Sequence, residues 1–165
     1  IITRFDLYKI GIGFDIHALS EGSILKIGGV EIPHCKGLIG HSDADVLVHA
    51  IMDAILGAVS LGDIGQHFPD TSLKYKNANS LDLLKKVYKL AKEKGFFISN
   101  MDCIVIAEKP RISNYFLEMR ENLAIVLELN LEQVSVKAKT SERLGFVGRE
   151  EGIAAQVVVL LKSSI

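Results

Sequence analysis

The feature that most constrains this chain is a pair of polar residues at the end of a strand-like apolar run. The run is Ile10-Gly11-Ile12-Gly13-Phe14, and Asp15 and His17 follow it closely. Residues two apart in an extended segment point to the same face, so the Asp15 carboxylate and the His17 imidazole are expected to project together. Taken alone, the pair also fits strand-end polar residues that are held by turn hydrogen bonds.

A second polar cluster interrupts the apolar segment 42–57. Residues four apart share a face of a helix, so Asp45, His49 and Asp53 would form one polar stripe on an otherwise apolar helix. A lone histidine there is commonly a hydrogen-bonded interior residue, but carboxylates on both sides can orient its ring as a metal ligand. One Asp and two His ligands leave the fourth position of tetrahedral zinc open, which is typical of a catalytic site.

The bulk properties restrict the class of protein. The chain has 165 residues, enough for one domain with a core, and its net charge of −1 favours neither nucleic acid nor an acidic membrane. With 48% hydrophobic residues and a mean hydropathy of +0.28, it is apolar enough to favour buried subunit contacts. Cys35 and Cys103 lack CxxC spacing and are expected to be reduced thiols, with a disulfide as the alternative. No apolar run reaches 18 residues, so no transmembrane helix is expected.

Apolar periodicity and turn residues predict alternating strands and helices. A strand over 9–14 and a glycine-turn hairpin over 24–32 come first, and residues 37–40 are expected to be loop. Helices are expected over 43–60 with Ser42 as N-cap, over 81–94 with Asn79 or Ser80 as cap, and over 113–127. Further strands are expected in 96–107, 134–139 and 153–161, an ordered loop in 62–71 and a mobile stretch in 73–78. The pattern favours an α+β fold with helices on one face of a sheet.

Several separate blocks of sequence, in the same order and without a large insertion, resemble one enzyme family. The blocks are residues 11–17, 42–57, 62–65, 68–70, 137–146 and 148–152. In these blocks the chain is similar to the 2-C-methyl-D-erythritol 2,4-cyclodiphosphate synthases of non-mevalonate isoprenoid synthesis. The resemblance covers residues 9–162 as one domain and leaves residues 1–8 as an N-terminal extension. It implies a mixed sheet of about four core strands, helices layered on one face, and a homotrimer around a threefold axis.

The resemblance also implies the metal ligands. One zinc ion per active site would be held by Asp15, His17 and His49. Asp45 and Asp53 would then orient the site or stabilise the helix instead of binding the ion.

Residues 139–142, with the sequence Lys-Thr-Ser-Glu, supply a cation, two hydroxyls and a carboxylate after a predicted strand. By themselves they also fit a polar turn. Magnesium or manganese prefers one carboxylate together with phosphate oxygens, which suits Glu142 as ligand of a second metal and Thr140 as a donor to a phosphate oxygen. The resemblance assigns to His41 the role of stabilising transition-state charge, and His41 and Thr140 are the expected catalytic residues.

Substrate contacts are expected in several places. Ser42 opens the first helix, where unpaired backbone N–H groups form a seat for a phosphate. Segment 63–65 offers a carboxylate beside an open backbone, which fits a vicinal diol such as ribose as well as an ordinary turn. By resemblance, residues 107–113 form a cytosine pocket, and Phe68 and Asp70 line a methylerythritol pocket. The expected substrate-binding residues are Ser42, Asp63, Ile64, Gly65, Phe68, Asp70, Ala107, Pro110, Arg111, Ile112, Lys139 and Ser141.

The implied reaction is an intramolecular phosphoryl transfer of the phosphorus–oxygen lyase class. In 4-diphosphocytidyl-2-C-methyl-D-erythritol 2-phosphate, the 2-phosphate attacks the β-phosphorus of the diphosphate, CMP leaves, and a cyclic diphosphate closes. Two metals would offset charge repulsion and hold the reacting groups in line. A zinc phosphohydrolase and a non-catalytic small-molecule binding module are the alternatives.

A central channel on the threefold axis is also expected, lined by Phe14, Phe146, Arg149 and Glu151. Apolar walls and a cation there would suit an isoprenoid diphosphate. Arg149 and Glu151 would form an ion-pair ring in the channel or remain ordinary surface charges.

The start of the chain bears on the compartment. It begins with Ile1 and not with Met, and eight residues precede the first matched strand. These features predict a plastid-type organelle, reached by a targeting segment that has been removed, with a bacterial cytoplasm as the alternative.

Overall fold

The computed structural model describes residues 7–164 of the chain. Residues 1–6 of the expected N-terminal extension, 1–8, lie outside the described residues. Tyr8, the last residue of that extension, is the first residue of a strand.

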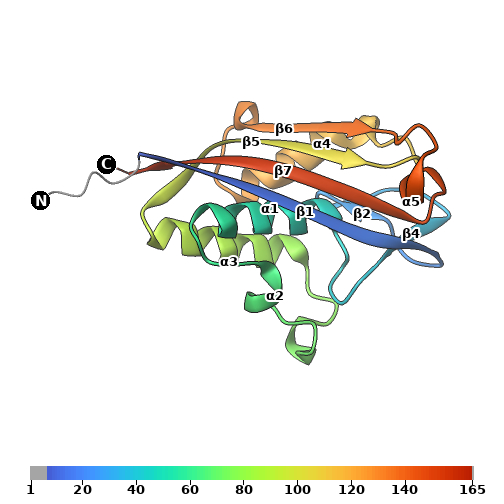
Figure 1. Ribbon diagram of the computed structural model, residues 1–165, viewed down its shortest axis with the longest axis horizontal. Coiled ribbons are helices and arrows are strands. Elements are labelled where there is room, and N and C mark those ends of the chain that lie inside the picture. The colour runs from blue at the N-terminus through green and yellow to red at the C-terminus, as the bar shows by residue number, and fades with distance from the viewer. Residues whose placement is uncertain (1–6, 165) are drawn as a thin grey trace, which may run out of the picture.

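A five-stranded mixed sheet forms the body of the fold (Figure 1). In spatial order its strands are β4 (Lys36–Ile39), β1 (Tyr8–Glu21), β7 (Gly152–Ser163), β5 (Phe96–Ile106) and β6 (Val134–Lys139). Neighbouring strands run antiparallel except β5 and β6, which are parallel. The α+β prediction is confirmed, but the sheet has five strands instead of about four. Residues 37–39 of the expected loop belong to β4, because they pair with the end of β1.

Strand β1 is longer than the sequence predicts. It continues past Phe14 to Glu21, because the pairing with β7 is maintained as far as Ala18. Asp15 and His17 therefore lie within a strand and not after one. They share the face of β1 that is turned toward the helices, as strand parity predicts.

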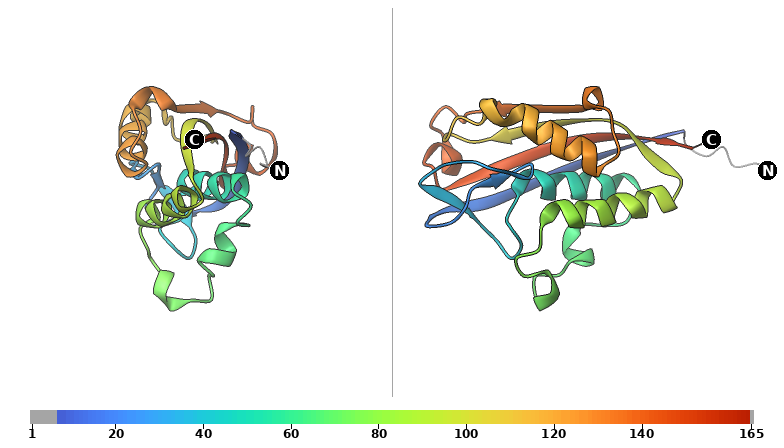
Figure 2. Two further views of the ribbon diagram at one scale, coloured as in Figure 1. Left: turned by 90° about the vertical axis from the view of Figure 1, so that its left-hand side faces the viewer. Right: turned by 180° about the vertical axis from the view of Figure 1, so that it is seen from behind.

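Three helices cover one face of the sheet: α1 (Val46–Ala58), α3 (Ser80–Glu93) and α4 (Phe116–Val126). Seen from behind in Figure 2, they lie in front of the strands. The three predicted helices are confirmed, with shifted ends. Helix α1 begins later than expected because Asp45, and not Ser42, is its N-cap: the Asp45 carboxylate accepts from the Val48 N–H at 3.1 Å. Asn79 caps α3, as expected.

Shorter elements complete the described part of the chain. The predicted hairpin is present as β2 (Lys26–Ile27) and β3 (Val30–Glu31), joined by Gly28 and Gly29 at positive φ. The other short elements are α2 (Ile64–His67), the 3-10 turns η1 (Leu73–Tyr75), η2 (Ser113–Tyr115) and η3 (Leu131–Gln133), and α5 (Gly145–Gly148). None of the helices in residues 7–164 is long and apolar enough to cross a membrane.

The core lies between the sheet and the helices, and α1 is its most deeply buried element. Strand β1 presents Gly11 and Gly13 to α1, and the missing side chains let the helix backbone come close. This close packing places Asp15 and His17, on the same face of β1, beside α1.

The opposite face of the sheet is apolar and exposed in the single chain. Its β1 residues are Ile10, Ile12, Phe14 and Ile16, with exposed fractions of 71, 62, 53 and 44%. Val158 of β7, which pairs with Ile12, adds to this surface. A contiguous apolar surface of this kind is typical of a protein–protein contact.

Candidate active site

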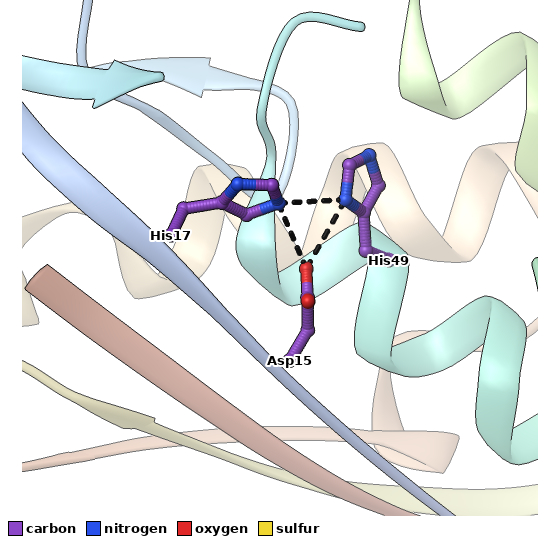
Figure 3. A group of neighbouring side chains, drawn as sticks. All are labelled: Asp15, His17 and His49. Carbon is purple, nitrogen blue, oxygen red and sulfur yellow. Dashed lines mark hydrogen bonds and ion pairs between the residues drawn. The ribbon is translucent and has the colours of Figure 1, made fainter. Parts of the chain in front are cut away.

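Asp15, His17 and His49 converge on one point (Figure 3). The His17 Nε2 atom lies 2.9 Å from Asp15 Oδ2 and 2.9 Å from His49 Nδ1, and His49 Nδ1 lies 3.1 Å from Asp15 Oδ2. In Figure 3 the two rings and the carboxylate point toward one another, with Asp15 and His17 on β1 and His49 on α1. Within residues 7–164 this is the one group of three such side chains whose ligand atoms come together.

The donor set fits a metal ion. Ligand atoms of tetrahedral zinc, at about 2.0–2.1 Å from the ion, lie roughly 3.3–3.4 Å apart. The three ligand atoms are 2.9–3.1 Å apart here, so a small outward movement accommodates the ion. The outer nitrogen of each ring has its own partner: His17 Nδ1 donates to the Ile39 carbonyl oxygen at 3.0 Å, and His49 Nε2 lies 3.0 Å from Ser80 Oγ.

The local charges suit metal binding. Burial alone would raise the pKa of Asp15, but hydrogen bonds from His17 and His49 outweigh it and lower that pKa to about 2. Burial would lower the pKa of His17, yet the hydrogen bond and charge of Asp15 raise it overall. Metal ligands must be deprotonated, and the Asp15 carboxylate is ionised at neutral pH.

The other carboxylates on this helix have structural roles. The Asp45 carboxylate is fully buried and accepts from the N–H groups of the 28–29 turn at 2.9 and 2.7 Å, so it fastens the β2–β3 hairpin while it caps α1. Asp53 Oδ1 accepts from the Ile64 N–H at 2.8 Å. These hydrogen bonds go to backbone amides and not to the His49 ring, so the polar stripe stabilises the fold around the site.

A cavity of about 370 Å³ opens onto the three converging side chains. Of the other predicted site residues, those that line it are His41, Ser42, Ile64, Gly65, Phe68 and Asp70. Met52, Tyr75 and Leu83, which the sequence analysis missed, complete its wall. Asp63, another predicted contact, is not in this wall; it is the N-cap of α2, where its Oδ1 accepts from the Gln66 N–H at 3.0 Å.

A second cavity, of about 410 Å³, lies at the ends of β5 and β6. The predicted site residues in its wall are Ala107, Pro110, Arg111, Ile112, Lys139 and Thr140. The two cavities share no lining residue, and β7 lies between β1 and β5 in the sheet. One chain therefore carries the metal-centred cavity and the 107–140 cavity on different parts of its surface.

The turn after β6 holds the remaining predicted residues. Thr140 Oγ1 donates to Glu142 Oε1 at 2.5 Å, and Glu142 and Arg143 have positive φ values of 52° and 64°. Glu108 fixes this turn, because its Oε2 accepts from the backbone N–H groups of Ser141 and Arg143 at 3.3 and 3.4 Å. The predicted 107–113 pocket includes Glu108, but sequence reasoning missed its contacts with this turn, although a carboxylate just past the end of a strand that pairs with β6 was the available signal.

The expected channel residues lie at the exposed surface. Phe14 is on the outer face of β1, and Phe146 of α5 is 37% exposed. Arg149 pairs with Glu151 of the same chain through two contacts, Nε to Oε1 at 2.9 Å and Nη2 to Oε2 at 3.0 Å. The channel and its isoprenoid diphosphate stay predictions.

Comparisons with known proteins identify the family of this chain. The YgbB family model matches residues 8–162. A protein of Geobacillus sp. (strain WCH70), named 2-C-methyl-D-erythritol 2,4-cyclodiphosphate synthase, is 58% identical over 156 residues, which cover 94% of this chain and 99% of that protein.

Solved structures share the fold. "IspF (Plasmodium falciparum) CDP complex" superposes with a TM-score of 0.86 at 36% identity, covering 98% of this chain and 99% of that one. The bifunctional IspDF from Campylobacter jejuni gives a TM-score of 0.91 at 46% identity over 94% of this chain, and the chain spans 42% of that longer protein. The resemblance read from the sequence blocks is confirmed, and the chain belongs to the YgbB family of 2-C-methyl-D-erythritol 2,4-cyclodiphosphate synthases.

Proposed function

We propose that the protein converts 4-diphosphocytidyl-2-C-methyl-D-erythritol 2-phosphate to 2-C-methyl-D-erythritol 2,4-cyclodiphosphate and CMP. Family membership over nearly the whole chain supports this activity. The observation that carries the proposal is the convergence of Asp15, His17 and His49 in the wall of a cavity. The attacking 2-phosphate is already anionic, so the reaction needs no side-chain nucleophile.

The three converging side chains would hold zinc. When bound, the ion would neutralise phosphate oxygens during the transfer. The contribution of the chain is orientation: the Ile39 carbonyl fixes the His17 ring, and Ser80 contacts the outer nitrogen of His49.

A second metal, magnesium or manganese, would be held by Glu142 together with the substrate diphosphate. The Glu142 carboxylate is exposed, and its contact with Thr140 Oγ1 places a hydroxyl beside it. Thr140 would turn that hydroxyl toward a phosphate oxygen, and Lys139 and Ser141 would supply further donors.

The metal-centred cavity would hold the methylerythritol part of the substrate. Phe68, which packs edge-on against Tyr75 with ring centroids 5.2 Å apart, forms an aromatic wall beside Ile64 and Asp70. The His41 ring, fixed by its contact with the Ser72 carbonyl at 3.0 Å, would stabilise phosphate charge, and Ser42 would contact a phosphate. Such a partly apolar wall also limits competing hydrolysis by water.

The 107–140 cavity would hold the cytosine. Ala107, Pro110, Arg111 and Ile112 line it just past the end of β5, where their backbone would contact the base. The Plasmodium falciparum relative is named as a CDP complex, which supports a cytidine nucleotide as the ligand. Asp63 would contact the ribose with its carboxylate. In this structure that carboxylate accepts hydrogen bonds from the backbone and side-chain nitrogens of Gln66.

One substrate spans a cytidine and a methylerythritol phosphate, whereas the two cavities of one chain share no wall. We therefore propose a homotrimer in which the 107–140 cavity of one subunit adjoins the metal-centred cavity of the next. The exposed apolar face that includes Ile12 and Phe14 supports such packing around a threefold axis. Phe146, Arg149 and Glu151 would line its axial channel.

The compartment that we propose is a bacterial cytoplasm. The Geobacillus relative, 58% identical, is bacterial, and this favours the alternative over the plastid-type organelle. The comparisons give no support to the plastid.

A product assay tests the function. Purified protein with zinc and magnesium, given the diphosphocytidyl substrate, should release CMP and the cyclic diphosphate in equal amounts. CMP together with a linear phosphate would indicate the phosphohydrolase, and CDP binding without CMP release would indicate a binding module.

A further inference from the structure

A chain of hydrogen bonds runs from the back of His49 to an ion pair. Ser80, fully buried at the first turn of α3, has its Oγ 3.0 Å from His49 Nε2. The Ser80 hydroxyl donates to Asp43 Oδ1, and the Ser80 backbone N–H donates to Asp43 Oδ2 at 3.1 Å. Lys26 of β2 places its Nζ 3.0 Å from the same Oδ2. Three elements that are distant in sequence thus meet behind one proposed metal ligand.

The directions of these bonds follow from the groups present. An ionised carboxylate can only accept, and the Lys26 ammonium beside it keeps Asp43 ionised. The single hydroxyl proton of Ser80 is therefore committed to Asp43, so Ser80 Oγ can only accept from the His49 ring. With zinc bound, the proton of the neutral imidazole would then lie on Nε2, and the lone pair of Nδ1 would bind the ion in place of the contact that Nδ1 makes with Asp15.

We infer that Asp43 and Ser80 are positioning residues of the metal site, which fix the orientation and the proton of the His49 ring so that Nδ1 binds the ion. This inference rests on the zinc site of the proposed function and adds two residues outside its ligand set. Ser42 Oγ lies 2.9 Å from the same His49 Nε2, so under this inference Ser42 and Ser80 would share the single Nε2–H as acceptors, and the Ser42 hydroxyl would direct its own proton elsewhere.

Zinc affinity, measured by competition with a chelator on the full chain, tests the inference. Ser80→Ala should bind zinc about 10–100-fold more weakly than the wild type, the usual effect of losing a partner behind a metal ligand. Ser80→Thr keeps a hydroxyl and should restore most of the affinity. Asn79→Ala is the matched control: it removes the neighbouring cap, in which Asn79 Oδ1 accepts from the Leu81 N–H at 2.9 Å, and should leave zinc affinity unchanged.

A spectroscopic readout separates positioning from a general loss of stability. In zinc-loaded, ¹⁵N-labelled wild type, the His49 Nε2–H should give a ring N–H resonance that exchanges slowly with solvent, assigned by its loss in His49→Gln. The resonance should persist in Asn79→Ala and Ser80→Thr and exchange rapidly in Ser80→Ala.

Each failure has a distinct meaning. If Ser80→Ala and Asn79→Ala both bind zinc as tightly as the wild type, the positioning role is overturned. The proposed function then still stands. Rapid exchange of the wild-type His49 N–H overturns the positioning role even if Ser80→Ala does not fold. A wild type that binds no zinc removes the metal site of the proposed function and this inference with it.

Discussion

Gly13 of β1 lies against the carbonyl oxygen of Ala50 in α1 so closely that a Cβ on Gly13 would stand 1.8 Å from that oxygen. His49 directly precedes Ala50, and Asp15 follows Gly13 on the same face of the strand. The contact between strand and helix therefore also sets the separation of two proposed zinc ligands. A substitution here should disturb both the core and the site.

Gly13→Ala should lower the free energy of unfolding by at least about 1–3 kcal/mol, because the clashing atoms belong to the helix backbone and cannot rotate away. Chemical denaturation measures the change. Gly57→Ala is the control: it adds the same methyl group to α1 where the nearest atom, Ile12 O, is 4.0 Å away. That variant should keep its stability or gain up to about 1 kcal/mol, and Gly13→Ala behaving in the same way would contradict the close-contact argument.

His49→Ala removes one of three proposed zinc ligands. Because even an outer partner of a ligand is worth about 10–100-fold in affinity, the variant should lose more than about 100-fold in zinc affinity, and CMP release should fall with it. Elemental analysis and the product assay measure the two effects. His34→Gln, outside the converging group, should retain both. Full zinc occupancy with normal turnover in His49→Ala would refute the ligand assignment.

The sequence could predict the proposed ligands on β1 because a local rule positions them. Strand parity puts Asp15 and His17 on one face whatever the rest of the fold does. The end of that strand was harder to predict, because polar residues after an apolar run often mark the end of a strand. The strand continues because its backbone pairing with β7 does not depend on which side chain each residue carries.

The contact between Ser80 and His49 is one that local sequence rules cannot predict. In the sequence Ser80 is a residue at the start of a helix, and capping is the ordinary interpretation. The packing of α3 beside α1 brings its hydroxyl to His49, 31 positions earlier in the chain. Asp45 is a similar case, because its contacts with the 28–29 turn depend on where the hairpin packs.

Glu142→Gln should separate the two proposed metals. The amide keeps the shape of the side chain but removes its charge, so zinc content should stay unchanged. CMP release should fall roughly tenfold or more, with a higher magnesium requirement. Glu132→Gln, an exposed carboxylate in η3, serves as the control for charge alone. Loss of zinc from Glu142→Gln would place Glu142 in the first metal site.

The two cysteines should differ sharply in reactivity. Burial raises the pKa of Cys103 to about 12, so it carries almost no thiolate at pH 8, whereas Cys35 is exposed. A thiol reagent should titrate one group per chain in the native protein and two after denaturation. Cys35→Ser should leave no reactive thiol in the native state. Two equivalents reacting in the native wild type would show that Cys103 is accessible.

The proposed shared active site requires the apolar outer face of the sheet to be covered. Ile12→Asp places a charge in the middle of that face and should convert a trimer to monomers, seen by light scattering, with loss of CMP release. Ile125→Asp is the matched control, because Ile125 is equally apolar and 78% exposed but lies on α4, on the helical side of the sheet. It should remain trimeric and active.

Mixing two impaired variants tests the sharing itself. If His49 of one subunit works with Glu142 of its neighbour, co-folded trimers of His49→Ala and Glu142→Gln contain interfaces in which both intact residues meet. Random mixing at equal amounts should make about a quarter of the interfaces competent and restore activity in that proportion. If the two residues of one chain served the same site, each site would keep one defect. The mixture would then be as inactive as its components, although both variants are trimeric and folded.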